Sequence, residues 1–387
     1  MVNFDELDTS SQNNFIRHEP GMLTSIYGTS DITPFWVADM DFKVAEPIQQ
    51  ELRRLAERGQ FAYEFDDQKV YEALVGWYQR RHNIDLKPEQ FAQVPGVLTG
   101  IALLIRELSE PGEGILIQTP VYHQFKHLIT KANRNLIESP LRIDNGHYRM
   151  DFDDLAAKFR SGNVRAMLLC NPHNPVGRVW TKDELEALVQ LANQYNVILI
   201  SDEIHSDIIY SKHAFTSIAS YSQQGHVALL GSPAKTFGMQ SISNGYIYTL
   251  NLERLEQVKA VVDAMYLGHG NAFSTYAAIA AYTKGDEWLD ELLTYLKNTL
   301  GWIQTFVETK LPLVSLYPVE GTYQVWMNFE NLGLTTDEVK EKLIAAKMGL
   351  TPGAWFGADS DYFYRMNIAS PLSVIQARFR ELERQLD

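Results

Sequence analysis

The stretch that decides the fold is Ser232-Pro-Ala-Lys235-Thr-Phe-Gly238-Met239. An apolar run with the character of a strand, residues 227–230, leads into it, and Gly231 and Pro233 then break the regular backbone. Lys235 follows just past this break. A lysine held between a buried strand and an aromatic residue loses solvation, so its neutral amine becomes easier to reach. A lysine in a tight turn that extends to water is the alternative, and the octapeptide alone does not separate the two.

Asp202 is a second polar residue at the end of a strand-like run, here residues 197–201. A carboxylate in that position is costly unless a positive group meets it. A neutral lysine amine condenses with an aldehyde, which is the first step of pyridoxal phosphate (PLP) chemistry, and the protonated pyridine nitrogen of PLP would pair with such a carboxylate. An aspartate that caps the following helix is the alternative for Asp202.

Three more candidates follow strand-like runs. The loop Asn171-Pro-His-Asn174-Pro-Val-Gly177 holds two Asn-Pro pairs that force a rigid, non-helical turn, and an asparagine fixed there can donate to a phenolate oxygen. Tyr122 would either stack on a flat heterocycle or pack in the core. His205 would either bond a cofactor oxygen or be a satisfied buried histidine.

Two further features concern anions. The glycine turn 94–100 opens a helical pattern, and the free N–H groups of a helix start are a place for a phosphate. Arg365 lies within an apolar run and predicts a carboxylate partner, either in a substrate or in the chain itself. His123 and His127 have a spacing that suits zinc but lack a third ligand, so we expect no metal site.

Short apolar runs alternate with helical patterns through the middle of the chain. The runs are 115–119, 136–139, 166–170, 197–201 and 227–230, and one intervening helix begins with the capping box Thr181-Lys-Asp-Glu184. Buried strands separated by helices predict an α/β fold with a mainly parallel sheet covered on both faces. Ligands bind such sheets outside the carboxyl ends of the strands, which is where the candidate residues lie.

The character of the chain changes at about residue 285. Beyond it, helical patterns at 288–309, 336–347 and 374–386 flank strand-like runs at 322–329 and 364–368, which predicts a smaller α+β domain. Residues 1–45 show no helical period and predict an extended arm. The expected division is therefore an N-terminal arm that joins the small domain, 1–45, a large domain, 46–285, and a small C-terminal domain, 286–387.

Composition narrows the classes of function. The net charge of −14 disfavours a nucleic-acid partner, which requires a basic face. Cys170 is the single cysteine, so no internal disulfide forms, which fits a cytoplasmic location. The start of the chain lacks the pattern of a secretory signal, and no apolar run approaches the roughly 18 residues of a membrane span. We therefore expect a cytoplasmic protein with neither a membrane nor a nucleic-acid partner.

Taken together and in this order, the motifs resemble those of the fold type I PLP enzymes, the aminotransferase class I/II superfamily, across nearly the whole chain. These motifs are Asn174-Pro-x-Gly177, Asp202-x-x-His205, Ser232-x-x-Lys235 and Arg365. The stretches Trp36-Val-Ala-Asp-Met-Asp-Phe42 and Gly321-Thr-Tyr-Gln-Val-Trp326 further resemble the bacterial cystathionine β-lyase (C–S β-lyase) branch. The resemblance implies an aspartate aminotransferase-like fold, a seven-stranded sheet in the large domain, and PLP as the cofactor.

The resemblance also implies roles for individual residues. Lys235 would bind the cofactor aldehyde and then move the Cα proton, while Tyr63 and Tyr122 would assist at the reacting centre. The cofactor would be held by Lys235, Asp202, Asn174, His205, Tyr122, Val97, Leu98, Ser232 and Tyr63. Arg365 and the backbone near Ala38 would hold the α-carboxylate of a small amino-acid substrate. Tyr63 would reach the neighbouring subunit, which implies a homodimer.

Several positions depart from the family pattern. Ser243 stands where many aminotransferases carry a phosphate-binding arginine that the lyases typically lack, which favours a lyase. Gly238-Met239 is closer to the aminotransferases, and Ala62 and Leu372 replace a glycine and an arginine that are common in the family. We expect a lyase that cleaves L-cystathionine or related cysteine S-conjugates to thiol, pyruvate and ammonia. An aminotransferase acting on an amino acid and a 2-oxo acid is the alternative.

Overall fold

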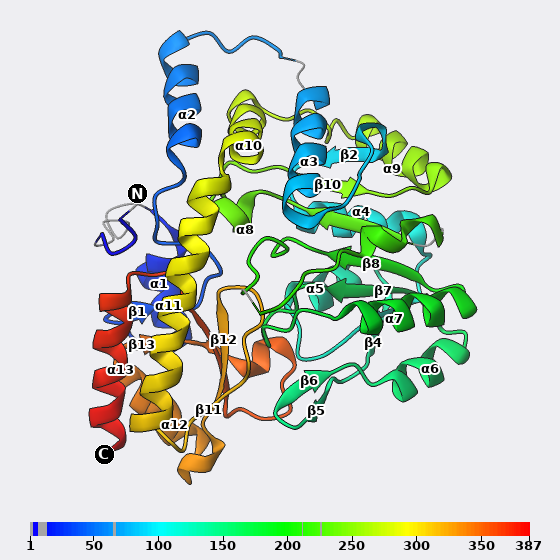
Figure 1. The fold of residues 1–387 in the computed structure, drawn as a ribbon. Helices are drawn as coiled ribbons and strands as arrows, with labels where there is room; N and C mark the ends of the chain where they lie inside the picture. Colours follow the sequence, from blue (N-terminus) through cyan, green and yellow to red (C-terminus); the bar gives the residue numbers. More distant parts are fainter. Residues whose placement is uncertain (1–2, 7–13, 65–66, 211, 225–226) are drawn as a thin grey trace.

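The structure is a computed structural model that describes residues 3–6, 14–64, 67–210, 212–224 and 227–387 (Figure 1). Parts of the predicted N-terminal arm, residues 1–2 and 7–13, lie outside the described residues. Within the described ranges, no helix is long and apolar enough to cross a membrane.

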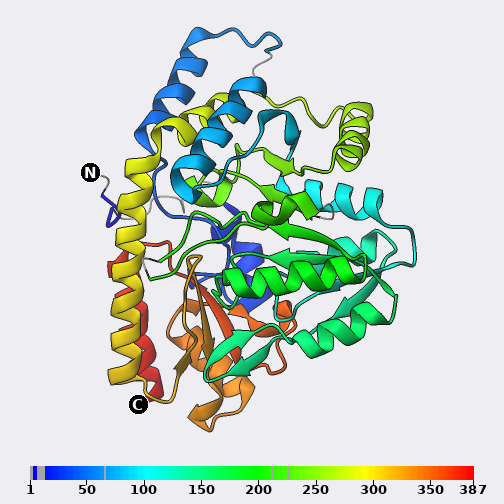
Figure 2. The same ribbon diagram turned by 45° about the vertical axis from the view of Figure 1, so that its right-hand side comes forward.

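A seven-stranded sheet forms the centre of the larger part of the molecule (Figures 1 and 2). Its strands are, in spatial order, β2 (Phe91–Val94), β10 (Gly245–Tyr248), β9 (Val227–Gly231), β8 (Ile198–Asp202), β7 (Val164–Cys170), β3 (Gly114–Ile117) and β4 (Asn135–Glu138). Strand β10 runs antiparallel to both of its neighbours, and the other pairs are parallel. The prediction of a mainly parallel sheet is confirmed. The sequence analysis named neither β2 nor β10.

Helices cover both faces of this sheet. On one face lie α4 (Val97–Leu108), α5 (Gln124–Lys131) and α9 (Leu252–Ala264), and on the other lie α3 (Asp67–His82), α6 (Phe152–Arg160), α7 (Lys182–Gln194) and α10 (Ala272–Lys284). Strand β8 shows why: Ile198 and Ile200 pack toward α4, whereas Leu199 between them packs toward α7. Successive side chains of a strand point to opposite faces, so a strand that is apolar throughout must be covered twice.

A smaller antiparallel sheet forms the second part, with the strand order β11 (Ser315–Leu316), β12 (Gln324–Asn328), β15 (Phe363–Asn367) and β14 (Thr351–Pro352). The 3₁₀ turn η6 (Gly353–Phe356) follows β14 directly. Helices α12 (Thr336–Ala345) and α13 (Leu372–Leu386) pack beside this small sheet. The long helix α11 (Asp286–Lys310) runs from the region of the large sheet down alongside α13 (Figures 1 and 2). The predicted helices and strands after residue 285 are therefore present.

The N-terminal segment contains a helix that the sequence analysis did not predict. Helix α1 (Pro20–Tyr27) begins at a proline, is capped by the Glu19 carboxylate, which accepts from the Met22 N–H at 2.6 Å, and ends at Gly28 with φ 79°. An extended arm throughout 1–45 was therefore wrong. Eight residues give too few turns for a clear period, although the proline start and glycine end were visible signals. Strand β1 (Thr33–Pro34) then pairs with β13 (Met348–Gly349), which joins this segment to the C-terminal part.

Helix α2 (Glu46–Arg58) has Pro47 in its first turn and ends at Gly59, which has φ 64°. Outside the two main sheets, β5 (Arg142–Asp144) and β6 (His147–Arg149) form a hairpin.

The short helix α8 (Ala234–Phe237) carries Lys235 and is anchored by a buried carboxylate. The Asp207 side chain accepts hydrogen bonds from Thr236 Oγ1 at 2.6 Å and from Trp77 Nε1 at 2.9 Å. It also lies 2.8 Å from His82 Nε2. The hydrogen bonds and charge of His82 outweigh burial and hold the pKa of Asp207 below its ordinary value, so the group is ionised. A helix of four residues is barely stable by itself. The Asp207 carboxylate stabilises α8 by tying it to α3.

We predict that Asp207→Asn lowers the free energy of unfolding by about 2 kcal/mol, because hydrogen bonds to a buried charged group are weakened and one donor is left poorly matched. A urea titration followed by circular dichroism measures the change. The matched control is Asp85→Asn at an exposed position, which should stay within about 0.5 kcal/mol of the wild type. Equal stabilities of the two variants would contradict the anchoring role.

Candidate active site

The carboxyl ends of three neighbouring strands bring the central residues together. In the register of the sheet, Asp202 at the end of β8 lies opposite Cys170 of β7 and Leu230 of β9. The Asn171 N–H donates to the Asp202 carbonyl at 2.9 Å, so the turn after β7 starts beside the end of β8. Lys235 comes five residues after Leu230, on α8. The predicted location of the site at this edge of the sheet agrees with the geometry.

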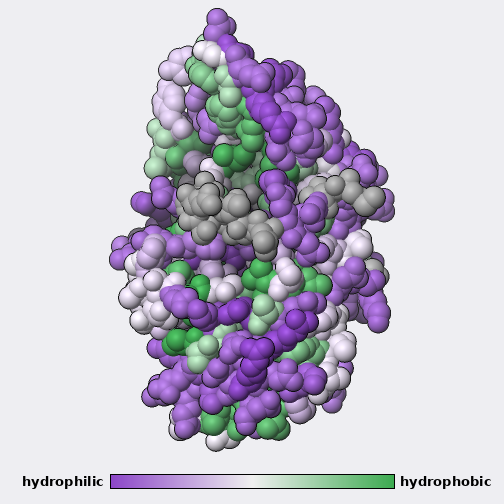
Figure 3. Space-filling view, turned by 90° about the vertical axis from the view of Figure 1, so that its left-hand side faces the viewer, coloured by the Kyte–Doolittle hydropathy of each residue, from purple (hydrophilic) through white to green (hydrophobic). Residues whose placement is uncertain are grey.

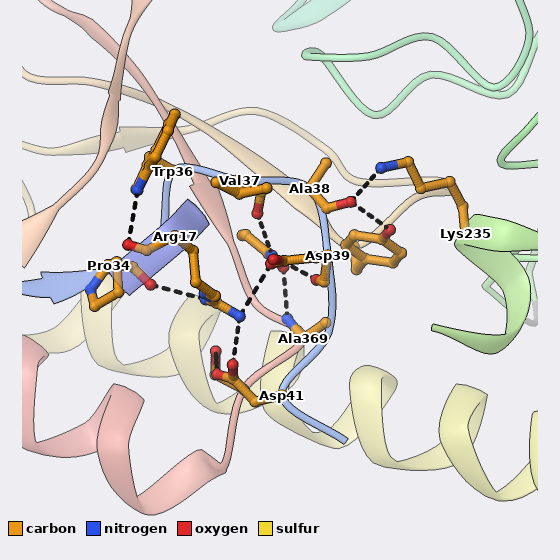
Figure 4. A network of polar contacts seen from close by, with 12 residues as sticks. Arg17, Pro34, Trp36, Val37, Ala38, Asp39, Asp41, Lys235 and Ala369 are labelled. Atoms are coloured by element: carbon orange, nitrogen blue, oxygen red, sulfur yellow. Dashed lines mark hydrogen bonds and ion pairs between the residues drawn. The ribbon is translucent and has the colours of Figure 1, made fainter. Parts of the chain in front are cut away.

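Lys235 is half-buried, and its amine points at the N-terminal segment rather than at bulk water (Figure 4). The Nζ atom donates to the carbonyl oxygen of Ala38, which also accepts from the Tyr323 hydroxyl at 3.1 Å. Burial lowers the pKa of Lys235 from 10.5 to about 8; the charges of Asp39 and Asp202 oppose this shift, and that of Arg365 adds to it. A substantial neutral fraction near neutral pH is what a nucleophilic amine requires.

The Asp202 carboxylate is buried, and its Oδ1 accepts from the Ile204 N–H at 3.1 Å. Burial raises its pKa to about 6, while the Ile204 N–H and the charge of Lys235 pull the value down. His205, three residues on, is also buried, and its Nδ1 has no hydrogen-bond partner among the described residues. Burial and the positive charges of Lys235 and Arg365 lower the pKa of His205, so its imidazole is neutral.

The segment around Ala38, whose carbonyl accepts the hydrogen bond from Lys235, is held by residues from both ends of the chain (Figure 4). The Asn367 amide donates to the carbonyls of Val37, at 2.6 Å, and Asp39, at 2.7 Å. The buried Arg17 guanidinium lies 3.0 Å from the Asp39 carboxylate and also pairs with Asp41. These contacts fix the direction of the Ala38 carbonyl.

Arg365, in β15, is a buried cation that contacts neutral groups. Its Nη1 donates to Asn174 Oδ1 at 3.1 Å, and its Nη2 donates to the Trp36 carbonyl at 2.5 Å. The Nε is buried without a hydrogen-bond partner among the described residues. Burial lowers the pKa of Arg365 to about 10, while Tyr122 and Tyr323 raise it, so the side chain stays charged. Nη2 also donates to the Thr351 hydroxyl at 3.4 Å. A buried guanidinium whose hydrogen bonds go to neutral groups is suited to a carboxylate from outside the chain.

Tyr122 is half-buried beside these groups. Burial raises its pKa, and the charges that act on it are those of Arg365, which lowers it, and Asp202 and Cys170, which raise it. Its ring therefore lies near both the strand ends and the arginine of β15. Its neighbours are edge-on to it: the His123 ring at 5.0 Å and the Phe125 ring at 6.1 Å.

The predicted phosphate-binding residues converge on one turn. Helix α4 starts at Val97 without a side-chain cap, so its first N–H groups have no such partner. A Cβ placed on Gly96 would meet no atom within 4 Å, which leaves open space before the helix, whereas a Cβ on Gly245 would come within 2.8 Å of the backbone at 96–97. The Ser232 hydroxyl donates to the Asn244 carbonyl at 2.8 Å. Ser232 and Val97 thus approach the same segment, with the partly exposed Leu98 beside them.

Among the predicted site residues, Tyr63 is the one that lies apart from the others within this chain. Its side chain is 95% exposed, and its ring lies 5.6 Å from that of His269. It lines an open depression of about 1310 Å³ together with Phe61, Tyr266 and Phe273.

Sequence reasoning assigned no role to Arg17, Asn367, Tyr323 and Asp207, which position the site from outside the carboxyl ends of the central parallel strands. The acidic residues of the Trp36–Phe42 motif were a usable signal, because two acids in a buried segment require a cation, here Arg17. The motif Gly321–Trp326 contains Tyr323, but no local pattern predicted that Tyr323 or Asn367 would contact Ala38 and its neighbours, about 300 residues away in the chain.

Comparison with known proteins agrees with this geometry. The family model described as aminotransferase class I and II matches residues 37–374. The chain is 34% identical to cystathionine β-lyase PatB of Bacillus subtilis, over 93% of this chain and 94% of that one. Cystalysin from Treponema denticola, whose crystal structure contains a pyridoxal 5′-phosphate cofactor, superposes with a TM-score of 0.93 at 28% identity, over 100% of this chain and 99% of that one. The PLP-bound C–S lyase from Staphylococcus hominis, in a complex with L-cycloserine, gives a TM-score of 0.92 at 28% identity, over 100% and 98%.

The match to the family model covers most of the chain, and the relatives are covered almost end to end. The fold, the lysine at the end of β9 and the buried arginine of β15 are consistent with that match. This chain therefore belongs to the aminotransferase class I and II family.

Proposed function

We propose that this protein is a PLP-dependent C–S β-lyase that cleaves L-cystathionine or related cysteine S-conjugates to thiol, pyruvate and ammonia. The observation that carries the proposal is the half-buried amine of Lys235, with its pKa lowered to about 8, set near the Asp202 carboxylate and the Arg365 guanidinium. Similarity to cystathionine β-lyase PatB and to the C–S lyase from Staphylococcus hominis supports the reaction class.

The residues present fit PLP. The buried Asp202 carboxylate suits a charged pyridine nitrogen, and the unpartnered Nδ1 of His205 suits an oxygen of the ring. Asn174 and Tyr122 also belong to the cofactor site in this proposal. The uncapped start of α4 at Val97 and Leu98, with open space beside it and Ser232 across the turn, suits a phosphate.

When bound, PLP supplies an electron sink for the negative charge that develops at the substrate Cα. Arg365 binds the α-carboxylate, assisted by the fixed backbone at Ala38. The neutral Nζ of Lys235 removes the Cα proton, as a general base with a pKa near the working pH does best. The Cβ–S bond then breaks with its electron pair on sulfur, which leaves as a thiolate and gains a proton. Hydrolysis of the remaining enamine gives pyruvate and ammonia.

Transamination of an amino acid with a 2-oxo acid is the second candidate, because the matching family model is named for aminotransferases. It begins with the same proton removal by Lys235 and differs in where the proton returns. Elimination regenerates the enzyme in each cycle, whereas transamination stops after one half-reaction unless a 2-oxo acid is supplied.

The proposal includes the division of the chain into an arm, 1–45, a large domain, 46–285, and a small domain, 286–387. The pairing of β1 with β13 and the separate antiparallel sheet support it. It also includes a cytoplasmic location, supported by the single, buried and free Cys170.

A homodimer completes the proposal, with Tyr63 reaching the site of the partner subunit. The support is a pair of exposed apolar side chains that line the depression beside Tyr63, namely Phe61 and Tyr266. Figure 3 shows a green band of apolar residues in the upper part of the face that carries α2. Large exposed apolar patches are typical of interaction surfaces.

We predict that the purified enzyme releases pyruvate and thiol steadily from L-cystathionine with no 2-oxo acid present. Lys235→Ala should lower kcat by about 10³-fold or more, because it removes the general base. The exposed Lys131→Ala is the matched control and should keep wild-type turnover. A single half-turnover that stops until a 2-oxo acid is added would replace the lyase by the aminotransferase.

We predict that Lys235→Ala and Tyr63→Ala, each strongly impaired alone, complement one another when mixed under conditions that exchange subunits. Half of the dimers would then be mixed, and each would carry one intact site, so activity should return to roughly a quarter of the wild-type value. Light scattering establishes the dimer mass in the same samples. A monomer, or a mixture with no gain in activity, would overturn the shared site.

A further inference from the structure

Four aromatic rings form a chain of contacts that begins at Arg365, and we call them the aromatic wall: Phe356, His123, Trp355 and Trp36. We propose that the aromatic wall receives the substituent on the substrate sulfur, and that the preferred substrates are cysteine S-conjugates with an uncharged aromatic or apolar leaving group. This inference rests on the proposed β-lyase function and adds to it the class of leaving group.

The register of the small sheet places the wall beside the arginine. Thr351 of β14 lies opposite Arg365 of β15, and the turn η6 follows β14 within two residues. The Arg365 guanidinium consequently lies over the Phe356 ring, 4.8 Å from its centroid. A substrate whose carboxylate meets Arg365 therefore lies close to these rings.

The rings also contact the strand-end side of the site. The Val121 N–H donates to the Phe356 carbonyl at 2.9 Å, which ties η6 to the turn that carries Tyr122 and His123. The Trp355 ring stands edge-on to the His123 ring at 5.7 Å. Since His123 follows Tyr122 in the chain and the two rings stand edge-on at 5.0 Å, the wall adjoins the site at Tyr122.

Trp355 is the outer member of the wall. Its side chain is 38% exposed, and its ring is edge-on to Trp36 at 6.3 Å. An indole that keeps more than a third of its surface open can still gain contact area when an apolar group arrives.

The wall carries no charge. The Gln124 amide lies 2.9 Å from His123 Nε2, which accepts from it, so the imidazole hydrogen is on Nδ1. Burial, together with the charges of Arg365 and His127, lowers the pKa of His123 to about 4, so the ring is neutral. The indole N–H of Trp36 is already used by the Arg17 carbonyl at 3.1 Å.

These properties discriminate between leaving groups. The leaving half of cystathionine carries an ammonium and a second carboxylate, and charged groups are costly to bury beside uncharged rings without partners. Arg365 is occupied by the first carboxylate. An aromatic substituent instead gains ring contacts and loses no hydration of a charge, so we expect a preference of about tenfold or more.

The first test compares kcat/KM for S-benzyl-L-cysteine and L-cystathionine, both of which release an alkyl thiol. The wild type should favour the benzyl conjugate by about tenfold or more, Trp355→Ala should reduce that ratio by about tenfold, and Trp355→Phe should retain most of it. The exposed Leu313→Ala is the control and should keep the wild-type ratio. Circular dichroism melting verifies that each variant is folded. A wild-type ratio at or below one, or a ratio that Trp355→Ala leaves unchanged, would overturn the inference.

The second test is binding, which does not depend on turnover. Calorimetric titration of the holoenzyme with 3-phenylpropanoate and with glutarate compares one carboxylate plus a ring with two carboxylates. The inference predicts tighter binding of 3-phenylpropanoate by about tenfold, reduced in Trp355→Ala. Tighter binding of glutarate would overturn it. If neither conjugate yields pyruvate but 3-phenylpropanoate binds as predicted, the lyase function fails while the assignment of the aromatic wall stands.

Discussion

The structure depends on one costly arrangement, which is a lysine amine taken out of water and aimed at a backbone carbonyl. Desolvation disfavours the charged form of Lys235, and the two nearby carboxylates, Asp39 and Asp202, return only part of the lost stabilisation. The fold offsets this cost by holding the surroundings rigidly. The Ala38 carbonyl accepts from the lysine and from Tyr323, and α8 is tied to α3 through Asp207.

This arrangement joins parts of the chain that are far apart in sequence. The segment around Ala38 comes from the N-terminus, its supports Tyr323 and Asn367 come from the small sheet, and Lys235 comes from the end of a central strand. The same small sheet delivers Arg365. One hydrophobic core joins the small sheet to a face of the large sheet, so packing rather than flexible loops sets the distances between the amine, the carboxylate and the guanidinium.

The sequence predicted those features that short local patterns of residues encode. Apolar runs ending in Asp202, Asn174 and the lysine turn predicted both a parallel sheet and a site at its carboxyl edge, because burial on two faces leaves continuous apolar runs. It did not predict α1, whose eight residues show no clear period, nor the edge strand β2. The supports of Ala38 could not be predicted, since nothing local distinguishes Asn367 from any other strand asparagine. Tyr63 was predicted from the family resemblance alone. Within one chain it lies apart from the other site residues, as expected of a side chain that acts in the site of a second subunit.

The central claim is that the Lys235 amine is partly neutral near physiological pH because it is buried. Competitive labelling of the cofactor-free protein with acetic anhydride, read peptide by peptide by mass spectrometry, tests it directly, with the exposed Lys131 as the internal reference. The neutral amine is the reactive form, so labelling of Lys235 should rise with pH and reach half its maximum near pH 8, where its lowered pKa lies. A midpoint near 10.5, the ordinary value for lysine, would contradict the account.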